Sequence, residues 1–469
     1  MSLTYLEAIQ ILQKEATSHR TTFSAPSETI PLAQAIKRIT SRQYCALRDT
    51  PQWDTSAMDG YAINSQVTQT ASEHTPVICQ VKETIAAGGE EVIINPTVGQ
   101  AAKKKKTPIC VEIMTGARFP RVESSHPFDV LDCCVKVEDT RPLSSSTVND
   151  GAESSSRLIQ ILAPARTNQN KRLAGEDFRR GDMIVDRHVV VRPNHVMALA
   201  SLGYECVEVL RKPRIALFST GAEIVCHTVE EAASGRQQVS DVNGPYLTSV
   251  LRETFACEVD FLGILEDNPT TAADTISDHL KRKQYDVVIT TGAVSMGRYD
   301  FVPKALEMLD ARVLFHKVAM KPGHPALFAS IPSVTNESKS TIPFFGLPGN
   351  PVAAAACLRF LVFPFLRWLL SQDLEEPRQA VVKSMVSSEQ RFASKDGSER
   401  NAIAIFPSDR DVFRTGTVIH QSRNNLEVQM IQDHSPGKIS PFLAADCWMH
   451  IHREKTVLHD GDVVDVFVI

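Results

Sequence analysis

The residues best able to do chemistry lie in four loops rich in glycine, each of which follows a short apolar run. The first loop, STGAEIV, carries Glu223, and the second, LGILEDNP, carries Asp267. The third, TTGAVSMGRYD, carries Ser295 and Asp300, and the fourth is FFGLPGNP at 344–351. Carboxylates beside backbone N–H groups suit a phosphorylated or oxyanionic ligand held with a hard divalent cation, most simply Mg²⁺.

Two lysines stand between the third and fourth loops, in the segment HKVAMKPGHP. Lys317 and Lys321 are compact cations with several donors each, and we assign them to the negative charge of the ligand. The FFGLPGNP loop should aim free backbone N–H groups at one spot, because a helix is predicted to begin at Pro351. Chemistry here would proceed by positioning and charge stabilisation, since no Ser-His-Asp or Cys-His spacing is present.

Each of these features also has a purely structural explanation. An acidic residue after a strand can cap a helix, a serine can stabilise a turn, a lone lysine is usually solvated, and proline is common at the first helical position. The joint pattern favours a binding site, because acidic residues, lysines and Gly loops recur at successive strand ends.

Short apolar runs alternate with helical patterns around these loops. We predict strands at 213–219, 258–265, 286–291 and 343–347, and helices at 245–255 and 270–282. This alternation indicates a doubly wound parallel sheet, in which ligands bind beyond the carboxyl ends of the strands. The apolar stretch 353–370 contains two arginines and Pro364, so we expect a buried helix interrupted near Pro364 rather than a membrane span.

Helices are predicted at the start of the chain and strands in most of the rest. Helical patterns cover 5–17, 31–39 and 193–202, and strand patterns include 76–81, 132–137 and 460–469. Two polar tracts, Lys103 to Lys106 and Leu143 to Arg157, are interpreted as surface insertions, although the lysine run could also be a localisation signal.

Composition sets the class of protein. A chain of 469 residues has room for roughly three or four domains. The net charge of −5 provides no field for binding polyanions, so we expect no nucleic-acid partner. The ten cysteines have no C-x-x-C spacing and indicate reduced thiols in a cytoplasmic protein. The N-terminal pattern is that of an amphipathic helix rather than a signal peptide.

Three further motifs extend the pattern: SAMDGYA at 56–62, IMTGARFP at 113–120 and GEDFRRG at 175–181. Together with the four loops, they resemble the molybdopterin molybdenumtransferase family, the MoeA proteins and gephyrin E domains, in the family's order and over essentially the full length. The resemblance implies molybdate insertion into adenylylated molybdopterin with Mg²⁺-dependent release of AMP, the last step of molybdenum cofactor assembly.

The resemblance also implies an elongated cytoplasmic homodimer with four parts in each subunit. These are a helical linker domain (1–50 and 164–207), an inserted β domain (51–163), a doubly wound parallel α/β domain like that of the adenylyltransferases (208–374) and a C-terminal β-barrel-like domain (375–469). Because the chain begins directly at the linker helix, we expect a separate chain to supply the molybdopterin adenylyltransferase.

The family's functional positions carry over residue by residue. The catalytic set is Asp59, Thr115, Asp177, Glu223, Lys317 and Lys321. The substrate-binding set is Gly292, Ser295, Gly297, Lys317, Lys321, Pro348, Gly349, Asn350 and Pro351. The metal set is Asp267, Asp300 and Glu223. Asp59 and Thr115 are expected to complete a site made mainly by the other subunit.

Three positions depart from the family's pattern. Ala222 and Ala293 stand where an acidic residue and a glycine are common, and His324 stands where a lysine is common. Ala293 adds a methyl group to a loop that favours a glycine conformation. Two other functions stay open, a gephyrin-like scaffold and a molybdopterin adenylyltransferase. The SAMDGYA and MTGA motifs favour the insertase over the adenylyltransferase.

Overall fold

The computed structural model describes residues 2–23, 27–95, 107–123, 130–143, 157–225, 239–295, 300–333, 341–384, 402–422 and 426–469. Its contacts divide the chain into two units. The larger unit contains Met1–Arg42, His188–Arg192 and Cys206–Ile469, and the smaller contains Gln43–Arg187 and Pro193–Glu205. The lysine run at 103–106, most of the tract between Leu143 and Arg157, and Gly297 lie outside the described residues. The four-domain division stays a prediction.

The α/β sheet of the larger unit has the strand order β19-β16-β20-β24-β23-β21. Its strands are β16 (Arg214–Thr220), β19 (Glu258–Leu265), β20 (Val287–Thr291), β21 (Arg312–His316), β23 (Leu327–Pro332) and β24 (Thr341–Leu347). β16, β19, β20 and β24 run parallel, which confirms the four predicted strands. β23 and β21 pair antiparallel, so the sheet is mixed rather than all parallel. Too few residues separate Pro332 from Thr341 for a crossover helix.

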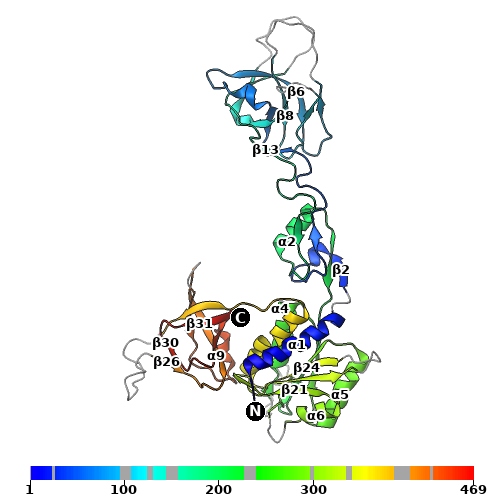
Figure 1. Ribbon diagram of the computed structural model, residues 1–469, viewed down its shortest axis with the longest axis vertical. Coiled ribbons are helices and arrows are strands. Elements are labelled where there is room, and N and C mark those ends of the chain that lie inside the picture. Colours follow the sequence, from blue (N-terminus) through cyan, green and yellow to red (C-terminus); the bar gives the residue numbers. More distant parts are fainter. Residues whose placement is uncertain are drawn as a thin grey trace. The chain divides into compact units, whose positions relative to one another are not determined.

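Helices cover both faces of this sheet. They are α1 (Tyr5–Phe23), α4 (Asn243–Phe255), α5 (Pro269–Arg282), α6 (Val302–Met308), α7 (Pro351–Cys357) and α8 (Phe363–Leu369). Leu217 and Phe345 pack on the face shared with α1, α4, α7 and α8, where α1 lies beside α8 (Figure 1). Ala216 and Phe344 pack on the opposite face, against α5 and α6. Burial on both faces explains why these strands are continuous apolar runs.

The long apolar helix is interrupted next to Pro364, as predicted. A π-helical segment at Leu358–Val362 separates α7 from α8, and the Phe363 amide bonds the Leu358 carbonyl. Proline has no N–H to donate to the carbonyl four residues earlier, and that carbonyl, of Phe360, accepts the Tyr5 hydroxyl at 3.2 Å. The stretch Pro351–Leu369 is long and apolar enough to span a membrane, but 78% of its apolar 18-residue window is buried inside the protein.

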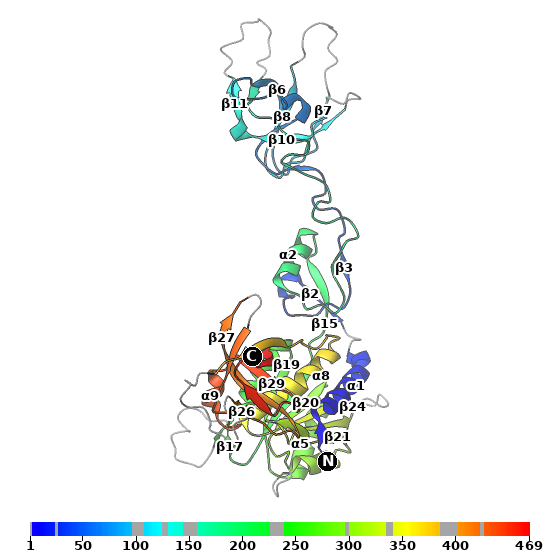
Figure 2. The same cartoon turned by 60° about the vertical axis from the view of Figure 1, so that its left-hand side comes forward.

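A five-stranded ring closes the C-terminal part of the larger unit. Its strands are β25 (Arg378–Val382), β27 (Asp411–Gln421), β28 (Leu426–Met430), β29 (Cys447–Ile451) and β31 (Val463–Val468). They pair in the order β27-β28-β25-β31-β29, and β29 pairs back to β27, which makes the sheet barrel-like (Figure 2). β22 (Val318–Lys321) adds to β27, and β1 (Leu3–Thr4) adds to β22. The ring is therefore joined to the strand that carries Lys321.

Smaller elements complete the larger unit. They are β2 (Ser27–Pro31), β15 (Cys206–Leu210), β17 (Ile224–Val225), β18 (Val239–Ser240), α9 (Ile439–Leu443), β26 (Ala402–Ile405) and β30 (Val457–His459). The helix predicted at 31–39 is wrong. β2 instead pairs with β15, followed by one 3-10 turn, Leu32–Gln34. Lys37 has a φ of 66°, which a helix cannot contain.

The smaller unit holds a six-stranded mixed sheet in the order β10-β5-β8-β6-β12-β11. Its strands are β5 (Gly60–Ile63), β6 (Val77–Ile85), β8 (Ile109–Ile113), β10 (Cys133–Lys136), β11 (Thr140–Leu143) and β12 (Leu158–Ile161). Short pairs join β3 (Tyr44–Cys45) to β14 (Met183–Val185), β4 (Thr55–Ser56) to β13 (Lys171–Arg172), and β7 (Ile93–Ile94) to β9 (Arg121–Val122). α2 (Pro193–Ser201) confirms a predicted helix.

Candidate functional site

A cavity of about 570 Å³ lies at the carboxyl ends of β16, β20 and β24. Nine residues predicted from the sequence line it: Glu223, Asp267, Gly292, Ser295, Asp300, Pro348, Gly349, Asn350 and Pro351. The loops converge because the parallel strands that precede them end at the same edge of the sheet. The lining also includes Asp241 and Asn243, which the sequence reasoning missed.

The loop after β20 is held in a backbone conformation that glycine favours. Gly292 has a φ of 91°, and a Cβ added there would lie 2.5 Å from Thr220 Oγ1 and 3.0 Å from the Thr220 carbonyl oxygen. The Gly292 amide donates to the Leu347 carbonyl at 2.8 Å, which ties the loop to β24. Ala293 has a φ of 51°, so the glycine-like conformation expected at this departure from the family is present.

The FFGLPGNP loop is fixed from two sides. The Asn243 side-chain amide donates to the Gly349 carbonyl at 2.8 Å. The Val352 amide donates to the Pro436 carbonyl at 3.0 Å, so one of the helix amides expected to face a ligand is already paired. The amides of Gly349 and Asn350 form no hydrogen bond with another described residue. The amides of this loop that are open to a ligand are therefore its own rather than the second amide of α7.

Asp241 connects the end of β16 to the start of α4. Its Oδ2 accepts the Ser219 hydroxyl at 2.7 Å, and its Oδ1 accepts the amides of Asn243 and Gly244, each at 3.1 Å. An aspartate that accepts amides two and three positions later is a helix-start signature, and the sequence SDVNGP contains it. That signal could have placed Asp241 and Asn243 at the site.

Besides Asp241, three carboxylates line the same cavity, each from one of the loops that follow strands. Asp267 Oδ2 accepts the Ala222 amide at 3.1 Å, which fixes the second loop against the first. Glu223 lies close to Gly221, where an added Cβ would be 2.9 Å from both carboxylate oxygens. Asp300 completes the set at the end of the third loop. An arrangement of carboxylate oxygens with loop amides can hold a hard cation beside an oxyanion.

The two lysines are not among the residues that line this cavity, although Pro325 of their segment is. Lys321 ends β22 and is exposed, whereas Lys317 is half-buried, with a φ of 77°. No hydrogen bond or ion pair joins either ammonium group to another described residue. Both charges are consequently available to a ligand.

Asp59 and Thr115 meet in the smaller unit. Asp59 Oδ1 accepts the Thr115 amide at 2.7 Å and the Thr115 hydroxyl at 2.9 Å. These two hydrogen bonds, the one from the amide having the larger effect, hold the pKa of Asp59 below its ordinary value, so the carboxylate stays charged. Asp177 instead forms an ion pair with Arg172 at 2.5 Å. The structure thus brings the first two together and gives the third a different partner.

Two family models match this chain. Residues 3–203 match the model described as "MoeA N-terminal region (domain I and II)". Residues 216–368 match the one described as "Probable molybdopterin binding domain". The two matches cover the smaller unit, and the α/β sheet through to α8.

Curated relatives match over nearly their full length. The molybdopterin molybdenumtransferase of Synechococcus elongatus is 30% identical over 442 residues, covering 89% of this chain and 99% of that protein. The molybdopterin molybdenumtransferase of Haemophilus influenzae is 28% identical over 447 residues, covering 95% and 94%. The fold is shared with the crystal structure of the molybdopterin biosynthesis MoeA protein of Pyrococcus horikoshii OT3, at a TM-score of 0.70 and 21% identity over 100% of both chains.

Proposed function

The chain belongs to the MoeA family of molybdopterin molybdenumtransferases, enzymes of molybdenum cofactor biosynthesis, and from that premise we propose that it inserts molybdate into adenylylated molybdopterin with Mg²⁺-dependent release of AMP. The observation that carries the proposal is the cavity at the strand ends, which Glu223, Asp267 and Asp300 line together with two Gly loops. Such a cavity suits a substrate that carries phosphates and must be held in one orientation.

Substrate binding falls to the two Gly loops. The amides of Gly349 and Asn350 and the hydroxyl of Ser295 would donate to phosphate oxygens, because donors of this kind form anion-binding concavities. The Asn243 bond to Gly349 keeps the first pair aimed before substrate arrives. Pre-organised donors stabilise charge without the cost of reorganisation during the reaction.

The donor set of the cavity fits Mg²⁺. Asp267 and Asp300 would hold the ion, with Glu223 as a third oxygen donor, since Mg²⁺ prefers carboxylate oxygens and retains several waters. When bound there, Mg²⁺ neutralises charge that develops on the leaving phosphate. Asp267 remains oriented throughout by the bond that it accepts from Ala222.

The lysines and the smaller unit supply the remaining groups of the proposed site. Lys317 and Lys321 would bind molybdate or phosphate oxygens, acting as multi-donor cations. Asp59 and Thr115 would face the α/β part of a second subunit in a homodimer, and Asp177, which pairs with Arg172, is the third proposed catalytic residue of the smaller unit. The proposal further includes a cytoplasmic location and a separate molybdopterin adenylyltransferase that supplies the adenylylated substrate.

AMP release tests the function directly. Purified protein is incubated with Mg²⁺, molybdate and adenylylated molybdopterin, and AMP is quantified by chromatography. We expect the wild type to release AMP, and Asp59→Ala and Lys321→Ala to lose most of that activity. Lys281→Ala is the matched control, because Lys281 is an exposed lysine on α5 that is paired with Asp278. Absence of AMP release by the wild type would overturn the proposal.

The adenylyltransferase alternative predicts no AMP release in that assay. Supplied instead with ATP and molybdopterin, an adenylyltransferase would accumulate the adenylylated product. The full-length match to proteins named molybdopterin molybdenumtransferase favours the insertase.

A further inference from the structure

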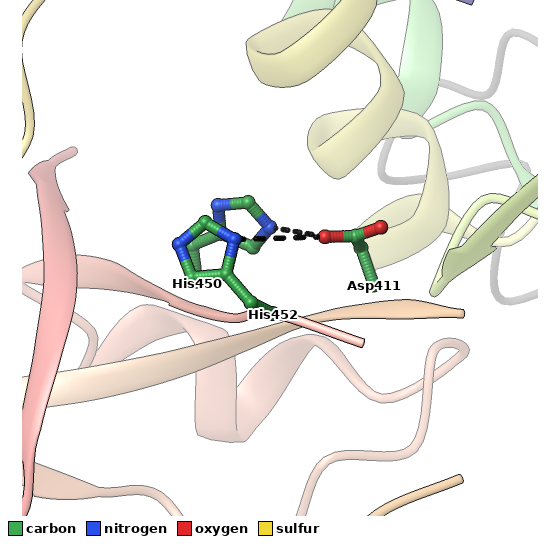
Figure 3. A group of neighbouring side chains, drawn as sticks. All are labelled: Asp411, His450 and His452. Carbon is green, nitrogen blue, oxygen red and sulfur yellow. Dashed lines mark hydrogen bonds and ion pairs between the residues drawn. The ribbon is translucent and has the colours of Figure 1, made fainter. Parts of the chain in front are cut away.

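A second group of possible metal ligands lies away from the cavity, on the barrel-like sheet. Asp411 begins β27, His450 is on β29, and His452 follows the end of β29 (Figure 3). Phe413 pairs with His450 across the two antiparallel strands, so Asp411 is placed opposite His452. Residues two apart on a strand share a face, which brings both imidazoles to the same side as the carboxylate. None of the three lines the 570 Å³ cavity.

The three ligand atoms are already close to one another. His450 Nε2 lies 2.8 Å from Asp411 Oδ1, and His452 Nδ1 lies 3.9 Å from the same oxygen. All candidate ligand atoms of the group lie within 4.8 Å of one another. Two ligands of a tetrahedral zinc ion are about 3.3 Å apart, a value that follows from bonds of about 2 Å. The two measured distances bracket this value, so shifts of about half an ångström would form the site.

Asp465 orients His452 for binding a cation. His452 Nε2 lies 2.8 Å from Asp465 Oδ2, and because a carboxylate only accepts, the imidazole donates there. In its neutral form His452 then has a lone pair on Nδ1, and that nitrogen faces the Asp411 oxygen. Gln379 donates to the other oxygen of Asp465 and fixes it in turn. A carboxylate that accepts the distal N–H is the usual second partner of a metal-binding histidine.

Buried and aromatic residues exclude solvent from Asp411 and His450. Asp411 and His450 are each 7% exposed, and the His450 ring stacks on Phe413 with centroids 4.5 Å apart. The Tyr5 ring meets the His450 ring edge-on, and the Tyr5 hydroxyl is already bonded to Phe360. His452 is exposed, so an ion and a bound water could enter from its side. The site is thus enclosed on one side and open on the other.

We propose that Asp411, His450 and His452 bind a divalent transition-metal ion of the Zn²⁺ class, at a site separate from the Mg²⁺ site proposed above. Two imidazole nitrogens and one carboxylate oxygen suit a borderline cation rather than Mg²⁺, which prefers oxygen ligands. The bound ion replaces the proton that His450 Nε2 shares with Asp411, and His450 then carries its proton on Nδ1.

The ion would link β27 to β29, which is the pairing that closes the barrel-like ring. Asp411 is also the register partner of Met320 on β22, next to Lys321. Binding would therefore stabilise the folded barrel and the strand that carries Lys321, by mass action.

Zinc binding by the full chain tests this assignment. Protein freed of metal by chelator is titrated with ZnCl₂ against a chromophoric competitor, and retained zinc is counted by mass spectrometry after gel filtration. We expect one ion per wild-type chain and a rise in melting temperature with zinc. His452→Ala should weaken binding at least tenfold and remove the zinc-dependent rise. Asp465→Asn should weaken it about 10- to 100-fold.

The controls separate this site from adventitious binding. His452 is exposed, so His452→Ala should melt like the wild type in the absence of metal, which shows that folding is intact. His459→Ala is the matched control, because His459 also lies near an aspartate, Asp462, at 3.7 Å. It should bind zinc as the wild type does. Equal zinc retention by His452→Ala, or no zinc retained by the wild type, would overturn the proposal.

Discussion

Gly292→Ala is the substitution that most directly tests how the third loop is held. Gly292 has a φ of 91°, a region that costs an L-residue about 1–2 kcal/mol. The added Cβ would also lie 2.5 Å from Thr220 Oγ1 and 3.0 Å from the Thr220 carbonyl oxygen. The Thr220 hydroxyl donates to the Thr291 carbonyl at 2.9 Å, so rotating it away breaks a buried hydrogen bond.

Two other glycines separate the cost of backbone strain from the cost of the contact with Thr220. Gly263 has a φ of 95° with no atom within 4 Å of an added Cβ, so Gly263→Ala reports backbone strain alone. Gly349 lacks a positive φ, and the nearest atom to an added Cβ is the Gly292 Cα at 3.4 Å. A lost buried hydrogen bond costs about 1 kcal/mol, and alanine recovers about 0.4–1 kcal/mol by restricting the unfolded chain. We therefore expect losses of stability in the order Gly292→Ala, Gly263→Ala, Gly349→Ala.

Urea unfolding measures this order. Gly292→Ala should be destabilised by about 1 kcal/mol more than Gly263→Ala, and Gly349→Ala should stay near the wild type. AMP release by Gly292→Ala should fall about 100-fold, because displacing a positioning loop by about 1 Å has an effect of that size. If Gly263→Ala and Gly292→Ala lost equal stability, the contact with Thr220 would not hold the loop, and the argument would fail.

Three further outcomes follow from single contacts. Asn243→Ala should raise KM in the AMP assay about tenfold and destabilise the fold by about 1–2 kcal/mol, because it frees the Gly349 carbonyl; unchanged KM would contradict a positioning role. Thr115 lowers the pKa of Asp59, so Asp59 loses its charge only below the ordinary carboxyl pKa of about 4. Titration of Asp59 should therefore cause no loss of rate above pH ~5, and the pH–rate profiles of the wild type and Asp59→Asn should have the same shape there. Tyr5→Phe should cost about 1 kcal/mol in denaturant unfolding without changing AMP release, since it leaves the Phe360 carbonyl unpaired.

The sequence predicted the strands that are buried on both faces of their sheet. β16 buries alternate residues on both faces of its sheet, so its apolar run was continuous and easily read. The helix predicted at 31–39 was wrong, because Pro31 pairs with β15 and Lys37 bonds to Val191, both far along the chain. Strands β21 and β23 were not predicted. β23 is a buried apolar run like the predicted strands, but its antiparallel pairing with β21 and β24 does not follow from that run.

The same division applies to the site. The predicted residues that follow strands line one cavity, since topology alone brings those loops together. Asp241 was missed because its helix-start signature lies outside the Gly loops and its bond to Ser219 is non-local. The group formed by Asp411, His450 and His452 depends on the register of β27 with β29, which no local spacing could reveal. In the fold and in the site alike, the features that depend on pairing between distant residues could not be predicted from the sequence.

Lys321 ends β22, and Lys317 directly precedes that strand. On a helix, residues four apart would lie side by side, but β22 is extended from Val318 to Lys321. Four residues of extended strand span roughly 13 Å, so the two ammonium groups would meet different parts of a long substrate. Sites more than about 7–10 Å apart contribute additively, to within about 0.5 kcal/mol. The double variant Lys317→Ala/Lys321→Ala should therefore lose kcat/KM by the product of the two single losses. A double variant no worse than either single one would mean that both lysines grip one oxyanion.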